Sequence, residues 1–215
     1  RTCCNREDGR RIEVGGSFYG DWTECSSNGG RGDQCIGAIE IHFVGCRWIN
    51  NGGQFAGASG CNLQNGPRGR ISGGVAFRNR GFGFDLSSAP VEASFVVAMG
   101  NYLGGLSAQA CAALQLDRFA CVTNFGAGAT LRTSFGGAPR HTVRNNYGGF
   151  VMTFAMFELS LGTATGNVSG SYKDVTLAAG SRAYVQGHHA SSVFAPSKNG
   201  RGSGDTLVFD DAMTG

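Results

Sequence analysis

The residues best suited to covalent chemistry in this chain are its eight cysteines. Six of them fall within the first 61 residues, and the other two stand close together later in the sequence. An even number of cysteines in a chain of 215 residues is typical of a disulfide framework, which persists in oxidising compartments. We therefore expect every cysteine to be paired in a disulfide: Cys3, Cys4, Cys25, Cys35, Cys46, Cys61, Cys111 and Cys121.

Two residues have the spacing of metal ligands on a strand. Glu40 and His42 alternate with apolar residues, so both side chains would project from the same face, where an i, i+2 pair can chelate a cation. His141 or His188 would have to supply a third ligand. Because a polar strand face usually contacts only water, we predict no metal and no other cofactor. Glu40 and His42 are the ligands to test first.

Two short motifs suggest recognition or modification. Arg31-Gly32-Asp33 lies in a glycine-rich stretch between Cys25 and Cys35, where a stapled loop would present a guanidinium and a carboxylate as integrin ligands do. A three-residue match also arises by chance in a chain rich in arginine and glycine. Asn167-Val168-Ser169 is a glycosylation sequon beside Gly166, so we expect Asn167 on an exposed turn that could carry a glycan.

No linear catalytic motif is intact in the sequence. The fifteen acidic residues are scattered, and any two could converge as a glycosidase pair only through the fold. A Gly-x-Ser-x-Gly nucleophile elbow is absent. We predict that the chain is not an enzyme, with a secreted hydrolase as an alternative.

The composition points to a surface made for contact. Glycine supplies 37 of the 215 residues, and charged residues make up only 15%, against about 25% in typical soluble domains. Weakly charged surfaces tend to be covered by a partner or by a copy of the same chain. The net charge of +3 is too small to predict nucleic-acid binding. No apolar run approaches the roughly 18 residues of a membrane span.

The local pattern is strand followed by turn. Residues 37–44 alternate apolar and polar side chains, as a half-buried strand does. Asn-Gly pairs at Asn28, Asn51, Asn65 and Asn199 predict tight hairpin turns. Further strands are predicted at residues 70–77, 93–99, 129–135, 150–161, 175–177, 183–186 and 206–209, and one helix at 108–119 with Ser107 as its cap.

These elements predict a mostly-β fold: an antiparallel β-sandwich or jelly roll with one short helix, stapled by disulfides. A right-handed β-helix is the alternative, since high glycine content suits stacked coils. We find no fixed period of about 20 to 50 residues, which counts against it. We expect one secreted domain over residues 1–215, with a cysteine-rich, loop-dense subregion at about 1–66. The chain does not begin with methionine, so we also expect that a leader was removed and that the protein is extracellular.

Low charge, glycine and disulfides together favour an extracellular structural protein that assembles with copies of itself. Edge strands would make the contacts, and the strand-like C-terminal segment Thr206, Leu207, Val208 and Phe209 is the predicted assembly element. The alternative is a lectin-like adhesin that binds glycans by stacking sugars on aromatic rings. The candidate rings for that function are Trp22, Trp48, Tyr102, Tyr147 and Tyr184.

Overall fold

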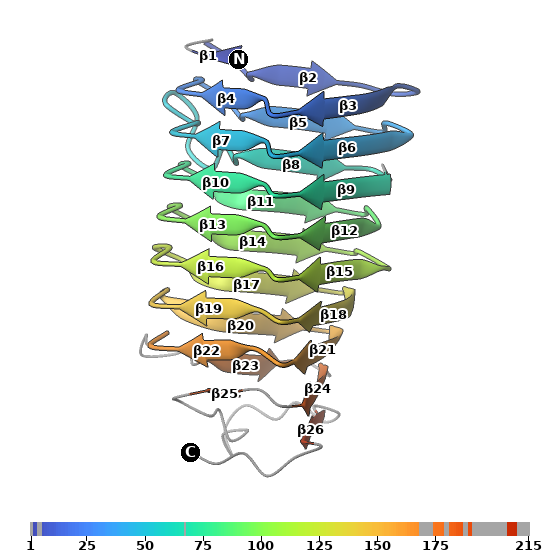
Figure 1. The fold of residues 1–215 in the computed structure, drawn as a ribbon, viewed down its shortest axis with the longest axis vertical. Helices are drawn as coiled ribbons and strands as arrows, with labels where there is room; N and C mark the ends of the chain where they lie inside the picture. The colour runs from blue at the N-terminus through green and yellow to red at the C-terminus, as the bar shows by residue number, and fades with distance from the viewer. Residues whose placement is uncertain are drawn as a thin grey trace.

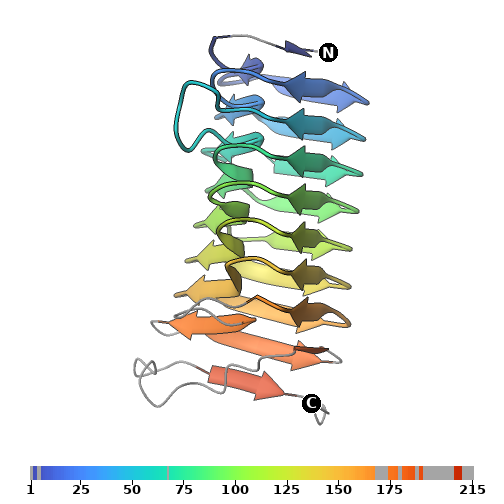
Figure 2. The same cartoon turned by 90° about the vertical axis from the view of Figure 1, so that its left-hand side faces the viewer.

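The computed structural model describes residues 2–3, 6–66, 68–167, 174–178, 181–186, 189–190 and 206–209. The chain winds into a parallel β-helix, in which each complete coil gives one strand to each of three sheets (Figure 1). Sheets A and C lie in front in this view and sheet B lies behind them. Seen from the side, the coils stack into a straight column (Figure 2).

Each sheet takes every third strand of the chain. Sheet A contains β1 (Thr2–Cys3), β4 (Glu24–Ser26), β7 (Arg47–Ile49), β10 (Val75–Phe77), β13 (Val97–Met99), β16 (Ala120–Val122), β19 (Thr142–Arg144), β22 (Thr163–Thr165) and β25 (His189–Ala190). Sheet B contains β2 (Arg10–Ile12), β5 (Asp33–Ile36), β8 (Cys61–Gln64), β11 (Phe82–Ser87), β14 (Gly104–Gln109), β17 (Ala127–Arg132), β20 (Gly148–Thr153) and β23 (Val175–Ala178). Sheet C contains β3 (Ser17–Asp21), β6 (Glu40–Val44), β9 (Arg68–Ser72), β12 (Val91–Ser94), β15 (Leu114–Asp117), β18 (Phe135–Pro139), β21 (Met156–Ser160), β24 (Arg182–Gln186) and β26 (Thr206–Phe209).

The predicted antiparallel sandwich is therefore wrong, and the β-helix alternative is correct. Neighbouring strands pair in parallel and in register, as where Val75 faces Val97 and Val97 faces Ala120. The predicted helix at 108–119 is also wrong: these residues form the end of β14, a corner and β15. A two-residue alternation is the same in parallel and antiparallel strands, so the pattern located strands without fixing their partners.

The interior of the β-helix is filled mainly by buried apolar side chains, many of which stack on similar side chains of the next coil. Phe43, Trp48 and Phe84 pack edge to face, with ring centroids 5.3 and 5.6 Å apart along this row. Leu63 and Leu86 lie opposite each other on β8 and β11 and are both fully buried. The residues that alternate with these core residues along each strand face outward. The same two-residue alternation therefore determines which side chains lie in the core and which lie on the surface.

Left-handed residues make the corners between sheets. Phe95 has a φ of 54° between sheets C and A, Ala110 has 54° between B and C, and Asn145 has 56° between A and B. In each case the next residue turns inward and is buried, as Cys111 is after Ala110. A single residue in this conformation bends the chain sharply, which keeps most coils short.

A ladder of buried asparagines runs along the corner between sheets A and B. Each member after the first accepts hydrogen bonds from the backbone N–H and the side-chain amide of the member before it, as Asn101 does from Asn79 at 3.0 and 2.9 Å. Its own amide donates to the next member and to a backbone carbonyl of the preceding coil. The ladder contains Asn28, Asn51, Asn79, Asn101, Asn124, Asn146 and Asn167, and it ends on the carboxylate of Asp174.

The ladder corrects the interpretation of Asn28 and Asn51, which were predicted to start hairpins. Both are buried, and the chain continues from each into the next parallel strand rather than turning back. It also reveals a period that the sequence analysis missed. Successive ladder residues are 23, 28, 22, 23, 22 and 21 positions apart. The long step includes a loop at residues 54–58, which stands out from the column (Figure 2).

A column of glycines at the start of the sheet B strands explains part of the glycine content. A Cβ on Gly83 would lie 2.8 Å from the carbonyl oxygen of Gly105, and a Cβ on Gly105 would meet Cys121 Sγ. Neighbouring coils therefore approach each other where any side chain would collide.

The predicted disulfide framework is wrong for the described residues. No disulfide links the six cysteines whose side chains the structure describes, and all six are buried: Cys25, Cys35, Cys46, Cys61, Cys111 and Cys121. They fill inward positions where other coils carry alanine, leucine, phenylalanine or valine, so they act as small apolar side chains. Burial raises the pKa of the Cys35 thiol to about 12, which keeps it protonated. The side chains of Cys3 and Cys4 lie outside the described residues.

The sheets continue past the end of the expected N-terminal subregion. β8 pairs with β5 and with β11, and β9 pairs with β6 and with β12. Residues on both sides of position 66 therefore belong to the same stack of coils.

Candidate functional site

The predicted metal ligands bond to each other on the outer face of sheet C. His42 Nε2 lies 2.9 Å from Glu40 Oε1, and the Tyr19 hydroxyl donates to Glu40 Oε2 at 3.1 Å. The hydrogen bond with His42, and then that from Tyr19, lowers the pKa of Glu40. No group of three or more metal-binding side chains occurs in the described part of the chain.

The Arg31-Gly32-Asp33 motif does not form a presented loop, because Asp33 is fully buried at the start of β5. Its carboxylate accepts a two-point ion pair from Arg10 at 2.6 and 2.5 Å and a hydrogen bond from Trp48 Nε1 at 2.6 Å. The Arg10 guanidinium also lies over the rings of Phe18 and Phe43. The Asp33 carboxylate is therefore part of a polar cap on the core and is not open to a partner.

Asn167 is fully buried rather than on an exposed turn. Its Nδ2, the atom to which a glycan would be attached, donates to the Val143 carbonyl at 2.7 Å and to Asp174 Oδ1 at 2.8 Å. The expected exposure is wrong, and glycosylation at this position would require the ladder to open.

The predicted assembly segment, Thr206 to Phe209, forms strand β26. It pairs in parallel with β24 of the same chain, at the end of sheet C. One edge of this strand is therefore occupied within the monomer, and contact with another chain through its other edge stays a prediction.

Two carboxylates on the outer face of sheet C are paired with arginines. Arg70 lies 3.0 Å from Glu92, and Arg140 bonds Asp117 at two points. Asp85 on sheet B differs, because burial raises its pKa while Ser107, Arg31 and Asn62 partly oppose the shift. The sequence prediction that the chain is not an enzyme stays a prediction.

The five aromatic residues predicted to bind sugars lie in different parts of the molecule. Trp48 is in the core, Trp22 projects from the corner between sheets C and A, and Tyr184 lies on sheet C. Only Tyr102 and Tyr147 share an edge, the corner between sheets A and B.

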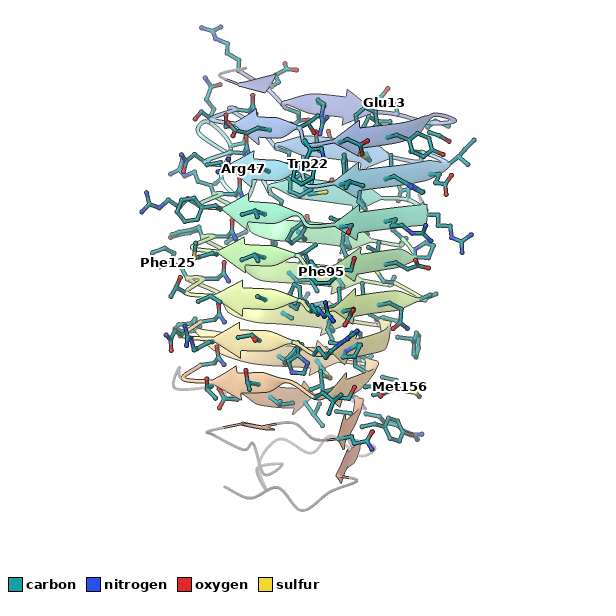
Figure 3. The ribbon with its side chains drawn as sticks, viewed as in Figure 1. Glu13, Trp22, Arg47, Phe95, Phe125 and Met156 are labelled. Atoms are coloured by element: carbon teal, nitrogen blue, oxygen red, sulfur yellow. The ribbon has the colours of Figure 1, made fainter. Side chains whose placement is uncertain are left out.

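That edge forms because of the asparagine ladder. Each ladder amide points inward, so the following residue points outward: Tyr102 follows Asn101, Phe125 follows Asn124 and Tyr147 follows Asn146. The three rings are 65, 69 and 55% exposed. Tyr102 and Phe125 have ring centroids 6.2 Å apart with a 39° tilt. Phe125 extends from the side of the column in Figure 3. The sequence analysis missed Phe125 because it did not detect the coil period.

An open hollow of about 630 Å³ lies beside the rings. Its walls combine aromatic, thioether and guanidinium groups. Arg78 is held over the ring of Phe77, 4.8 Å from its centroid, and Arg80 donates to the Gly53 carbonyl at 3.3 Å. The lining residues are Phe77, Arg78, Asn79, Arg80, Met99, Gly100, Tyr102, Thr123 and Phe125.

The charge along this side of the molecule has one sign. From β7 to Tyr147, sheet A and its corner with sheet B carry arginines and no acidic residue, whereas Glu40, Glu92, Asp117 and Glu158 lie on sheet C. The arginines of this side are Arg47, Arg78, Arg80 and Arg144. We call Arg78, Arg80, Tyr102, Phe125, Tyr147 and Arg144 the basic aromatic edge.

The outer face of sheet A next to this edge is apolar over β10, β13 and β16. All six of its outward side chains are hydrophobic: Val75, Phe77, Val97, Met99, Ala120 and Val122. The outer faces of the neighbouring sheets carry polar residues at the same level, such as Ser107 and Gln109 on sheet B and Gln115 and Asp117 on sheet C.

Comparisons with protein-family models, curated proteins and solved structures found no match to this chain. None of the described residues forms a helix that is long and apolar enough to cross a membrane.

Proposed function

We propose that this protein binds an extended polysaccharide along the basic aromatic edge. The observation that carries the proposal is the row of three exposed rings, Tyr102, Phe125 and Tyr147, repeated once per coil. Exposed aromatic rings present flat apolar faces that can stack on the C–H faces of sugars, while a tyrosine hydroxyl bonds to sugar hydroxyls.

The regular spacing supports a polymer as the ligand. Adjacent coils are separated by about 4.8 Å, so the rings form a strip along the long axis of the molecule. A chain of sugars lying on this strip would contact several rings at once, and contacts along one polymer add up. A small ligand would use one ring only.

The packing of the rings favours sugars over nucleic-acid bases. Bases bind such rows by stacking on individual rings. Tyr102 and Phe125 already form an interacting pair at 6.2 Å between centroids. A base inserted between the two rings would have to separate them, whereas a sugar can stack on the ring faces that stay exposed.

The test is a binding assay with immobilised polysaccharides, comparing the wild type with Tyr102→Ala and Phe125→Ala. Each substitution should weaken binding about tenfold, since it removes one stacking surface of about 1.4 kcal/mol. Tyr184→Ala and Phe154→Ala are matched controls, because these rings are 45 and 62% exposed on other parts of the molecule. Unchanged binding by the two edge variants would contradict the proposal.

A second candidate function is self-association, as expected for a structural protein. It is supported by the apolar outer face of β10, β13 and β16, where a contiguous hydrophobic surface would gain stability by being covered. A second copy of the chain, packed sheet A against sheet A, would cover this surface with the same kind of side chains. This lateral contact is a different route from the predicted contacts at residues 206–209.

Sedimentation velocity over a concentration series tests this second candidate. Val97→Asp places a charge at the centre of the apolar face and should convert a dimer or polymer to monomer. Thr130→Asp, on the outer face of sheet B, should leave association unchanged. A wild-type chain that stays monomeric at all concentrations would exclude self-association. The extracellular location, which was argued from disulfides, stays a prediction.

A further inference from the structure

We infer that the polysaccharide bound at the basic aromatic edge is anionic, with carboxylate or sulfate groups held by Arg78, Arg80 and Arg144. This inference rests on the proposed function, because it names the class of polymer that the same edge selects. It depends on the placement and surroundings of three arginines.

The first support is that these arginines have no acidic partner. No carboxylate among the described residues forms an ion pair with Arg78, Arg80 or Arg144. Three arginines elsewhere in the molecule are neutralised by a carboxylate: Arg10 by Asp33, Arg70 by Glu92 and Arg140 by Asp117. The positive charge of the edge is therefore available to an anion that comes from outside the chain.

The second support is that two of the guanidinium groups are already held in place. Arg78 is stacked on Phe77, and Arg80 is anchored at the Gly53 carbonyl. Both line the hollow that also contains Tyr102 and Phe125. A guanidinium offers a planar pair of donors that matches a carboxylate or sulfate, and holding it in advance lowers the entropy lost on binding.

The third support is that the arginines lie on both sides of the aromatic rings along the axis of the β-helix. Arg78 and Arg80 follow β10, whereas Arg144 ends β19, and the coils of Tyr102 and Phe125 lie between them. Three coil steps separate the two groups of arginines, or about 14 Å along the axis. One polymer can contact both groups only if it carries repeated acidic units, and its sugar rings would then cross the aromatic strip.

The charge on sheet C is mixed. Glu92 and Asp117 on its outer face are neutralised by Arg70 and Arg140, and Glu40 is hydrogen-bonded to His42. The basic aromatic edge instead has arginines and no acidic residue, so a uniform positive charge favours an anion on that side.

The experiment compares alginate with its propylene glycol ester, which keeps the sugar backbone and masks the carboxylates. Heparin is included as a sulfated polymer, and oligothymidylate as a nucleic acid that carries its negative charge on phosphates and offers bases for stacking. Binding to alginate or to heparin should be at least about tenfold tighter than to the ester, and should weaken as salt increases. Because heparin carries carboxylates as well as sulfates, tighter binding to heparin than to alginate would indicate that sulfates add to the affinity, and tighter binding to alginate would indicate that carboxylates are sufficient.

Arg78→Gln, Arg80→Gln and Arg144→Gln should each reduce the preference for the acidic form while leaving binding of the ester unchanged. Arg132→Gln is the matched control, because it removes the same charge from an exposed position on sheet B. An equal loss for Arg132→Gln would overturn the inference, since net charge alone would then explain binding.

The remaining outcomes of the experiment also distinguish between the inference and the proposed function. Equal binding of alginate and its ester, both lost in Tyr102→Ala, would leave the proposed function standing and overturn this inference. Tighter binding of oligothymidylate than of either polysaccharide would overturn it in favour of nucleic acid. If none of the polymers bound, the proposed function and the inference would both fail.

Discussion

Among the residue types of this chain, buried asparagine best explains how successive coils are held together. A primary amide has both a donor and an acceptor, so one buried asparagine can bond to the coil before it and the coil after it. Asn101 does this with four side-chain hydrogen bonds, to Asn79, Ala76 and Asn124. No apolar residue could replace it without leaving backbone groups unpaired inside the core.

Asn101→Ala should therefore lower the free energy of unfolding by about 3 kcal/mol, since it leaves the Asn79 N–H and the Ala76 carbonyl without their hydrogen-bond partner. Urea denaturation followed by circular dichroism measures this loss. Gln109→Ala, at an exposed position on β14, is the control and should change stability by less than about 0.5 kcal/mol. Equal effects of the two substitutions would show that the ladder adds nothing beyond an ordinary polar contact.

The buried thiols predict a pH dependence. Burial raises the pKa of Cys35 to about 12 and that of Cys121 well above its usual value. In the unfolded chain these thiols ionise near pH 8.5. Since the native thiols hold their protons longer, their contribution to stability is complete below that pH and is lost as the pH rises toward 12.

The free energy of unfolding should thus fall above about pH 9, by up to about 1.4 kcal/mol per pH unit for each such thiol. Urea titrations at several pH values between 7 and 11 measure the slope. Cys121→Ala should have a shallower slope than the wild type, because one native thiol no longer resists ionisation. Parallel curves for the two proteins would contradict the assignment.

At the scale of elements, the start of each sheet B strand is the most crowded part of the coil. Gly105→Ala should destabilise the protein by roughly 1–3 kcal/mol or more, because its methyl group would overlap Cys121 Sγ and approach the Gly128 carbonyl at 2.6 Å. Gly53→Ala is the matched control, since its methyl group would meet only the Asn28 carbonyl at 3.9 Å. Thermal unfolding of the two variants should separate them clearly; similar melting temperatures would argue against close coil packing.

Strand positions were more predictable than strand partners. The alternation at residues 37–44 contains β6, and the apolar segment 150–161 contains β21. Their pairing depends on corners made by residues such as Phe95 and Ala110, which adopt positive φ without being glycine. Nothing in their side chains indicates this conformation, so the parallel connection could not be read from local sequence.

The candidate site was predictable in part. Tyr102 and Tyr147 were among the expected sugar-binding rings, and their chemistry follows from residue type. Their alignment with Phe125 and with the three arginines depends on the coil period. The loop at 54–58 lengthens one step between ladder residues to 28 positions and obscures that period.

On the scale of the whole molecule, each coil contacts mainly its neighbours, so the protein is close to one-dimensional. Deleting residues 97–119 removes one complete coil and lets Ala120 follow Val96, in the position that Val97 held. This variant should keep its β-type circular dichroism and unfold cooperatively with reduced stability. Deleting residues 97–108 removes about half a coil, breaks the register and should abolish folding. A folded half-coil variant would contradict the stacking of complete coils.

The ladder also gives the protein an electrical direction. Every amide in it turns its carbonyl toward the first coil and its N–H toward the last, and the small dipoles therefore add instead of cancelling. Asp174 places a negative charge at the positive end of this row. A carboxylate at the positive end of aligned dipoles is stabilising, so Asp174 is suited to be the last acceptor of the ladder.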